Sequence, residues 1–306
     1  MSVRIGLGTS TQPFSGPRAF FRWAELCDAG GIDSIWQTDR LASEEPYLEA
    51  LSTMAALAGA TERVKFGMNA VVVTTRDPLV LAKQCATIDY LSGGRLLPVF
   101  GIGGAKAPEW EATGRSPKGR GARADEALEI MQRLWSEESV DFDGEHFQYR
   151  GASISPRPVQ SPLPLWIGGH SKAAIRRTAR LGTGWLGGVQ DPATVGPVIE
   201  AIQREAEAQG RAIQPDHFGA TFPFRIGKPD DAAASGYVRG LERAGVDAKN
   251  WLAVGSAADV IARCRQYRDA GVHKFVLIPL AQGDDDWMEQ TRRITDEVVP
   301  VVHAWE

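Results

Sequence analysis

The sequence predicts an α/β fold, a single (β/α)8 barrel with an insertion after its fourth strand, from three observations. Eight short apolar segments alternate along the chain with segments of helical period. No change in composition marks a linker, and 306 residues is an ordinary length for one such barrel. The unit at 64–108 has two apolar strands joined by an amphipathic helix, which is the crossover unit of a parallel sheet. A doubly wound sheet is the alternative on the same pattern.

Each strand and helix is assigned from a local signal. The strands are short apolar runs, many of them rich in β-branched residues, and are expected at 3–8, 32–37, 64–73, 95–100, 165–169, 184–188, 217–226 and 274–279. The helices are expected at 20–29, 46–60, 78–92, 122–135, 171–181, 192–209, 230–244, 256–270 and 285–304. Asp77 and Asp191 each precede a proline and cap a helix, and Ser256 with Asp259 resembles a capping box. Gly31 and Gly93 mark the ends of the first and third helices.

The insertion is expected at about 105–163, and the chain 1–306 is expected to form one domain. Residues 105–121 are rich in Gly, Pro, Lys and Arg and form a loop that is long enough to act as a lid. Residues 140–149, centred on Asp143-Gly144, predict a hairpin outside the barrel.

Composition excludes several classes of function. A net charge of −4 argues against nucleic acid as a partner, and no apolar run approaches the roughly eighteen residues of a membrane span. The N-terminal segment enters a strand directly, so no signal peptide is expected. The 3 cysteines are scattered among predicted helices, which is typical of reduced thiols in a cytoplasmic protein. The 5 histidines lack metal-ligand spacing, so no metal is expected, and the absence of G-x-S-x-G argues against a serine hydrolase.

Candidate functional residues follow the strands, at the end where a barrel binds its ligands. Asp39 follows the second strand directly, either as a catalytic group or as a helix cap or ion-pair partner of Arg40. The diglycine Gly168-Gly169 precedes His170 and Ser171 at a helix start, where free N–H groups hold a phosphate, although a tight turn needs glycine as well. His170 suits phosphate binding or proton transfer near neutral pH.

Other motifs are less specific. Gly6-x-Gly8 and Gly101-x-Gly103 each begin a dinucleotide-binding fingerprint but lack its third glycine. Some of the 9 tryptophans are expected to line a pocket for a flat ligand and the others to fill the core. Five basic residues either attract a polyanionic cofactor tail or form a solvated loop: Lys106, Arg115, Lys118, Arg120 and Arg123.

Four stretches together resemble the luciferase-like flavin oxidoreductases: 31–41, 77–95, 123–135 and 164–185. The resemblance implies a barrel that binds FMN or the deazaflavin coenzyme F420 at its carboxyl face. It places the cofactor phosphate at Gly168, Gly169, His170 and Ser171, after the fifth strand. It also implies cofactor contacts from Asp39, Ile167 and the turn at Gly103 and Gly104, and a non-prolyl cis peptide bond at Asn69-Ala70, behind the middle ring.

The resemblance implies hydride transfer between coenzyme F420 and a small organic substrate. The alternatives are an FMN-dependent monooxygenase fed by a separate flavin reductase and a non-catalytic cofactor-binding or partner subunit. The sugar-phosphate dehydrogenases of the family have Asp-His where this chain has Asp39-Arg40, and arginine is no general base. Arg40 is instead expected to hold an anionic substrate or to pair with Asp39, and the proton donor is Asp39, Glu109 or His170.

Two further expectations concern assembly and an alternative chemistry. Related barrels often dimerise through their second and third helices, which implies a homodimer that buries part of 46–60. An aldolase or isomerase on the same fold would need a lysine at the ligand end of a strand. Lys65 and Lys274 instead open their strands and therefore lie at the opposite end.

Overall fold

The computed structural model describes residues 2–228, 230–243, 245 and 247–305, and in these residues the main sheet is a closed parallel barrel. Six of its strands are continuous: β1 (Arg4–Thr9), β2 (Ser34–Gln37), β9 (Trp166–Gly168), β10 (Gly184–Val189), β11 (Phe218–Ile226) and β13 (Lys274–Pro279). The third and fourth are interrupted, and each consists of two short strands: β3 (Lys65–Met68) with β4 (Val71–Val72), and β5 (Leu96–Leu97) with β6 (Val99–Gly101).

Pairing of the two interrupted strands closes the ring. β3 pairs with β5 and β4 pairs with β6, so the third strand follows the fourth along both of its halves. The remaining neighbours run β6, β9, β10, β11, β13, β1, β2 and β3, all in parallel register. The predicted (β/α)8 barrel is therefore confirmed, and the doubly wound alternative is wrong.

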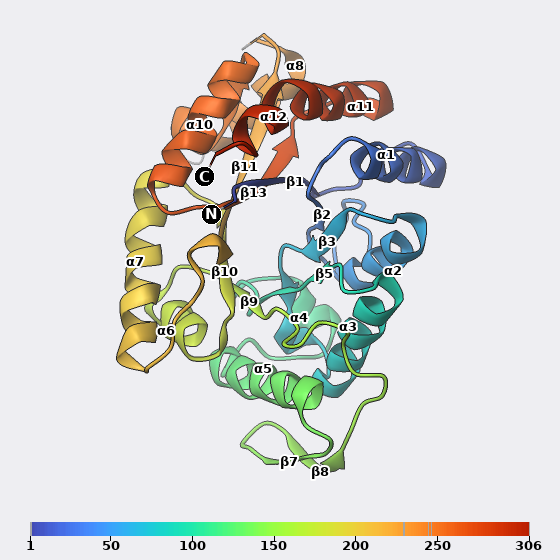
Figure 1. Cartoon of the computed structure of the whole chain (residues 1–306), viewed down its shortest axis with the longest axis vertical. Coiled ribbons are helices and arrows are strands. Elements are labelled where there is room, and N and C mark those ends of the chain that lie inside the picture. The colour runs from blue at the N-terminus through green and yellow to red at the C-terminus, as the bar shows by residue number, and fades with distance from the viewer. Residues whose placement is uncertain (1, 229, 244, 246, 306) are drawn as a thin grey trace.

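Helices form the outer ring around these strands (Figure 1). They are α1 (Pro17–Ala29), α2 (Ala50–Ala60), α3 (Pro78–Ser92), α5 (Arg120–Ser136), α6 (Lys172–Leu181), α7 (Pro192–Ala208), α8 (Ala232–Arg243), α10 (Ala257–Asp269) and α11 (Gly283–Arg293). The predicted caps are confirmed, since the Asp77 and Asp191 carboxylates accept hydrogen bonds from backbone N–H groups in the first turns of α3 and α7. Ser256 and Asp259 form the expected capping box.

Several predicted boundaries are wrong for local reasons. The helix expected at 46–60 begins at Ala50, because the Glu49 side chain caps it by accepting a hydrogen bond from Ser52 N. The loop at 105–121 contains the short helix α4 (Glu109–Ala112). The helix expected at 285–304 is interrupted, and α11 continues through a π-helical turn η3 (Ile294–Val298) into α12 (Val299–Val302). For the helix expected at 230–244, Ala244 lies outside the described residues.

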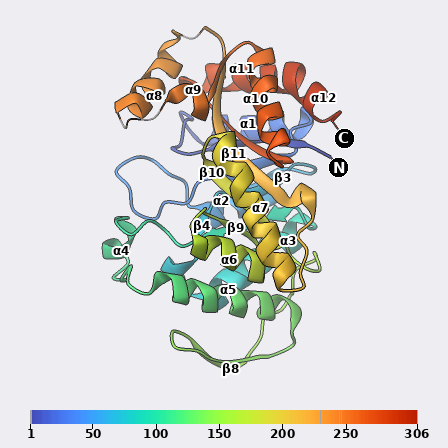
Figure 2. The same cartoon turned by 90° about the vertical axis from the view of Figure 1, so that its left-hand side faces the viewer.

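Smaller elements complete the described chain. The predicted hairpin is present as β7 (Val140–Asp143) and β8 (Gln148–Ala152), and it projects from the barrel beside α5 (Figures 1 and 2). The 3-10 turns η1 (Val73–Thr75) and η2 (Pro215–His217), the helix α9 (Ala248–Trp251) and the strand β12 (Ala253–Gly255) carry no clear sequence signal.

Large indole rings fill the inside of the barrel, and glycines on the facing strands make room for them. A Cβ atom on Gly6 would lie 2.6 Å from Trp36 Nε1, and one on Gly67 would lie 2.5 Å from Trp36 Cζ3. A Cβ on Gly8 would meet Val276 Cγ1 at 2.9 Å. Gly6-x-Gly8 is therefore a packing motif of the barrel interior and not part of a dinucleotide-binding fingerprint.

The two ends of the barrel have different surroundings. The chain termini lie at one side of the molecule, and α4 and α8 lie at the other, where the strands have their carboxyl ends (Figure 2).

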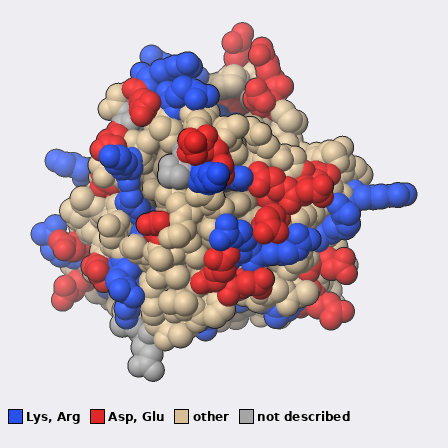
Figure 3. Space-filling model, turned by 90° about the horizontal axis from the view of Figure 1, so that it is seen from above, with Lys and Arg blue, Asp and Glu red and all other residues tan. Residues whose placement is uncertain are grey.

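Seen from above, positive and negative side chains lie side by side among uncharged areas (Figure 3). Within the described residues, no helix is both long enough and apolar enough to cross a membrane.

Candidate functional site

A surface of small residues lies at the carboxyl ends of the third, fourth and fifth barrel strands. A Cβ atom on Gly101 would lie 3.7 Å from Ala70 Cβ, and one on Gly168 would lie 3.8 Å from the same atom. Three neighbouring strands therefore form one surface from the methyl group of Ala70 and the backbone of Gly101 and Gly168, which have no side chains. Such a surface allows a flat ring to approach the backbone closely.

The peptide bond that leads into this surface has the expected geometry. Asn69-Ala70 is cis, as predicted, in the gap between β3 and β4. The Asn69 side-chain amide donates a 2.9 Å hydrogen bond to Thr221 Oγ1 on β11. Because β11 lies on the opposite side of the ring from β3, this bond crosses the barrel. Thr221, which is buried, fixes the Asn69 side chain across the barrel and was not predicted from sequence.

Asp39 is held in a buried ion pair, and its partner is not Arg40. Both carboxylate oxygens of Asp39 accept hydrogen bonds from Arg76, at 2.7 and 2.8 Å, and Oδ2 also accepts one from Val72 N at 3.0 Å. Arg76 reaches Glu49 Oε1 as well, at 3.0 Å. Burial alone would lower the pKa of Arg76, but the hydrogen bonds and charges of the two carboxylates outweigh burial and raise it. The expected pairing of Asp39 with Arg40 is wrong.

Arg40 instead pairs with Glu109 of α4. The distance from Arg40 Nη1 to Glu109 Oε1 is 3.3 Å, and the side chains are 44% and 5% exposed, respectively. The second oxygen, Glu109 Oε2, is buried and has no hydrogen-bond partner among the described residues. The site thus brings together two sequence-predicted residues, and one of them keeps a buried carboxylate oxygen available.

The glycine turn after β6 has a packing role that the sequence did not reveal. Trp110 Nε1 donates a 2.7 Å hydrogen bond to Gly104 O. Gly103 has a φ of 72°, and a Cβ there would lie 3.0 Å from Val72 Cγ1 and 3.2 Å from Trp110 Cζ2. The left-handed backbone and the close indole both require glycine at 103.

The diglycine turn after β9 leads into the start of α6, as expected. Gly169 has a φ of 103°, and the Ser171 side chain caps α6 by accepting a hydrogen bond from Ala174 N. Residues that follow such a cap have N–H groups without helical partners, so the turn can bind an anion. Ile167 precedes the turn on β9, and its side chain packs in the hydrophobic core.

His170 is an exposed residue whose ring is held by a glutamine that was not predicted. Gln190 Nε2 lies 2.7 Å from His170 Nδ1, within hydrogen-bond distance. Gln190 follows β10, and its own Oε1 is buried without a partner among the described residues.

Of the basic residues expected near the cofactor, Arg120 and Arg123 belong to α5. Arg123 donates a hydrogen bond to Ser116 O, and Arg120 Nε is buried without a partner in the described chain. In the same residues, no group of three or more His, Cys, Asp and Glu side chains is placed to hold a metal ion. The three cysteines are buried and free, and burial raises the pKa of each thiol.

Comparisons with known proteins relate this geometry to a family. Residues 1–248 match the family model of the luciferase-like monooxygenases. A protein of Amycolatopsis mediterranei named F420-dependent glucose-6-phosphate dehydrogenase is 26% identical over 99% of both chains. A protein of the same name from Nocardia farcinica is 27% identical, over 90% of this chain and 91% of its own.

Solved structures share the fold. An F420-dependent secondary alcohol dehydrogenase, solved with an F420-acetone adduct, superposes with a TM-score of 0.85 at 20% identity over 99% of both chains. The coenzyme F420-dependent tetrahydromethanopterin reductase of Methanopyrus kandleri superposes with a TM-score of 0.80 at 18% identity, over 98% of this chain and 99% of its own.

Proposed function

Because the chain belongs to the luciferase-like monooxygenase family, we propose that it is an oxidoreductase that uses coenzyme F420 to transfer a hydride to or from a small organic substrate. Its full-length likeness to proteins named as F420-dependent dehydrogenases supports this cofactor. The observation that carries the proposal is the surface formed by Ala70, Gly101 and Gly168, which suits a flat tricyclic ring.

The residues around this surface fit the rest of such a cofactor. The turn from Gly168 to Ser171 offers backbone N–H groups at the start of α6 for a phosphate. Two buried side-chain oxygens have no hydrogen-bond donor among the described residues. They are Glu109 Oε2 and Gln190 Oε1. Buried acceptors of this kind are commonly satisfied by a ligand or an ordered water.

When bound, coenzyme F420 supplies a ring carbon that accepts or donates the hydride, and the chain provides position and proton transfer. An alcohol that gives up a hydride from carbon also gives up its hydroxyl proton, so a base must stand beside it. Glu109 is our candidate for that base, because Arg40 holds one carboxylate oxygen and the other is free. Asp39 is a positioning residue in this proposal, because Arg76 and Val72 N occupy its carboxylate.

The proposal is tested by titrating the purified protein with coenzyme F420 and with FMN while following tryptophan fluorescence. We expect saturable binding of coenzyme F420. Gly168→Val should weaken that binding about tenfold or more, which corresponds to about 1.4 kcal/mol of lost contact. Gly188→Val is the matched control, because a Cβ at Gly188 would meet no atom within 4 Å.

Two outcomes would contradict the proposal. Saturable binding of FMN without binding of coenzyme F420 would favour a flavin monooxygenase that depends on a separate reductase. Binding of neither cofactor at high concentration would favour a non-catalytic subunit. Circular dichroism of both variants verifies that any lost binding reflects the surface and not unfolding.

A further inference from the structure

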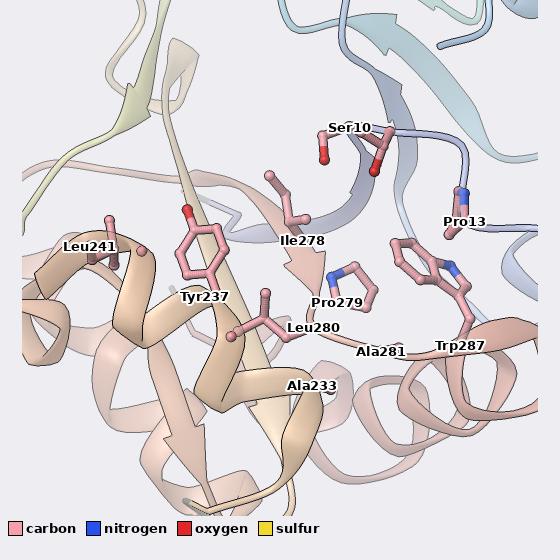
Figure 4. Close-up of a pocket in the computed structure, with 13 residues that line it drawn as sticks. Ser10, Pro13, Ala233, Tyr237, Leu241, Ile278, Pro279, Leu280, Ala281 and Trp287 are labelled. Carbon is pink, nitrogen blue, oxygen red and sulfur yellow. The ribbon is translucent and has the colours of Figure 1, made fainter. Parts of the chain in front are cut away.

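A second feature lies at the mouth of the barrel, the end where its strands have their carboxyl ends. It is a cavity of about 610 Å³ on the opposite side of the mouth from Ala70. It lies between the ends of β1 and β13 and the helices α8 and α11 (Figure 4). Ser10 follows β1, Ile278 and Pro279 end β13, Tyr237 stands on α8, and Trp287 belongs to α11. The volume is in the range of small-molecule sites, which is about 300–1,000 Å³.

Every described residue that lines this cavity is uncharged. Its walls are made of aliphatic, aromatic, proline and glycine surface, with hydroxyl groups contributed by Ser10, Thr11 and Tyr237. Figure 4 shows the Tyr237 ring rising from α8 with its hydroxyl group directed away from the helix. Burial raises the pKa of Tyr237, so this hydroxyl stays protonated and can donate a hydrogen bond at neutral pH.

The cation beside the cavity wall is already neutralised. Arg225 donates a hydrogen bond to the backbone oxygen of Leu280, which is a lining residue. The same guanidinium binds Asp231 Oδ2 at 2.9 Å and Asp286 Oδ2 at 2.7 Å. One positive and two negative charges leave this cluster with a net charge of −1. A phosphate placed in the cavity would lose its hydration and meet net repulsion.

One polar group in the wall lacks a partner. Trp287 is 5% exposed, and its Nε1 has no hydrogen-bond acceptor among the described residues. In Figure 4 this nitrogen lies on the side of Pro13, which also lines the cavity. Buried donors without partners are commonly satisfied by a ligand or an ordered water.

We propose that this cavity holds the apolar body of the substrate, whose reacting carbon and oxygen extend from the cavity towards Glu109 and the surface of Ala70, Gly101 and Gly168. The substrate is then an uncharged, largely apolar molecule with a hydroxyl or carbonyl oxygen and not a phosphorylated sugar. The assignment of the ligand as substrate rests on the proposed oxidoreductase function. The chemistry of the walls sets this chain apart from the activity for which its F420-dependent glucose-6-phosphate dehydrogenase relatives are named.

The test measures binding of two probes to the purified full-length protein by saturation-transfer NMR, first alone and then with coenzyme F420. Acetophenone represents a neutral apolar carbonyl compound, and glucose 6-phosphate represents a phosphorylated sugar. We expect acetophenone to bind and glucose 6-phosphate to give no signal. Ala233→Trp, which places an indole in the cavity, should weaken acetophenone binding about tenfold or more, equivalent to about 1.4 kcal/mol.

Two matched variants make the result specific. Ala232→Trp is the same change at the neighbouring, exposed position of α8 and should leave binding unchanged. Gly236→Leu blocks the cavity with little steric risk, because a Cβ there would meet no atom within 4 Å, and it replaces Ala233→Trp if that variant does not fold. All three variants should keep the affinity of the wild type for coenzyme F420.

The outcomes separate this inference from the proposed function. Binding of glucose 6-phosphate, or failure of acetophenone to bind at its solubility limit, overturns the inference even if coenzyme F420 binds normally. Acetophenone binding that Ala233→Trp and Gly236→Leu leave unchanged also overturns it. Loss of acetophenone binding in those variants, in a protein that fails to bind coenzyme F420, supports the neutral cavity and contradicts only the proposed function.

Discussion

The buried pair between Asp39 and Arg76 should contribute far more to stability than an ion pair at the surface. The Asp39 side chain is 1% exposed and that of Arg76 is 12% exposed. Arg76→Met removes the guanidinium but keeps an apolar stem, so the Asp39 carboxylate would remain buried with Val72 N as its donor. Breaking a buried pair by removing one partner costs about 3–5 kcal/mol. We expect a loss of that size in the free energy of unfolding.

The measurement is urea denaturation at pH 7, followed by tryptophan fluorescence and compared at a common m value. Arg292→Met is the matched control, because Arg292 pairs with Glu289 at 3.6 Å while both side chains are more than half exposed, at 55% and 58%. The control should lose less than about 1 kcal/mol. The double variant Asp39→Asn/Arg76→Met removes both charges and should recover part of the loss. If Arg76→Met is no more destabilised than Arg292→Met, the buried-pair reasoning is refuted.

The remaining predictions concern pH and packing. Burial lowers the pKa of His303 to about 4 from 6.5, so the unfolded chain binds the proton more readily and stability falls as pH drops from about 6.5 towards 4. The free energy of unfolding is measured by urea titration at pH 7 and pH 5. His303→Gln should reduce the difference between the two values by about 1–2 kcal/mol, after allowance for solvent screening. His273→Gln is the control, and an unchanged slope in His303→Gln would contradict the assignment. Gly67→Ala should destabilise the barrel by about 3 kcal/mol, because its Cβ would lie 2.3 Å from Leu97 O and 2.5 Å from Trp36 Cζ3. Gly59→Ala, in an open position of α2, should instead stabilise by about 0.5–1 kcal/mol, and equal melting temperatures for the two alanine variants would exclude this packing account.

The barrel could be predicted because its signals are local. Asp77 and Asp191 before prolines and the capping box at Ser256 each specify a helix start from adjacent residues, and each is present. Predicted helix boundaries were wrong where the end of the helix is set by a side-chain interaction that the hydrophobic pattern does not show. Glu49 caps α2 with its side chain, so the helix begins at Ala50 and not at the predicted Pro46.

The position of the candidate site could be predicted from sequence, but the pairing of its side chains could not. Strand ends identify Asp39 and Gly168 as neighbours of the mouth, since parallel strands end at a common edge. The resemblance to the luciferase-like family adds Ala70 to them. The partner of Asp39 lies 37 residues further along the chain, whereas the adjacent Arg40 looked like the natural candidate. Which of two arginines reaches a carboxylate depends on backbone direction after a strand, and charge patterning does not encode this direction.

The two sides of the mouth are held together by different interactions, and this difference matches the two roles proposed for them. On the side of Asp39, three charged side chains and the backbone N–H of Val72 fix the loops after β2 and β4, and this would fix the position of the proposed ring. On the side of α8, uncharged residues line an open cavity whose shape depends on the volumes of their side chains. A cavity of this kind can change its ligand through single substitutions without breaking a polar network. Cofactor placement and substrate choice can therefore vary independently within one barrel, which is why likeness to a sugar-phosphate dehydrogenase supports the cofactor but not the sugar phosphate.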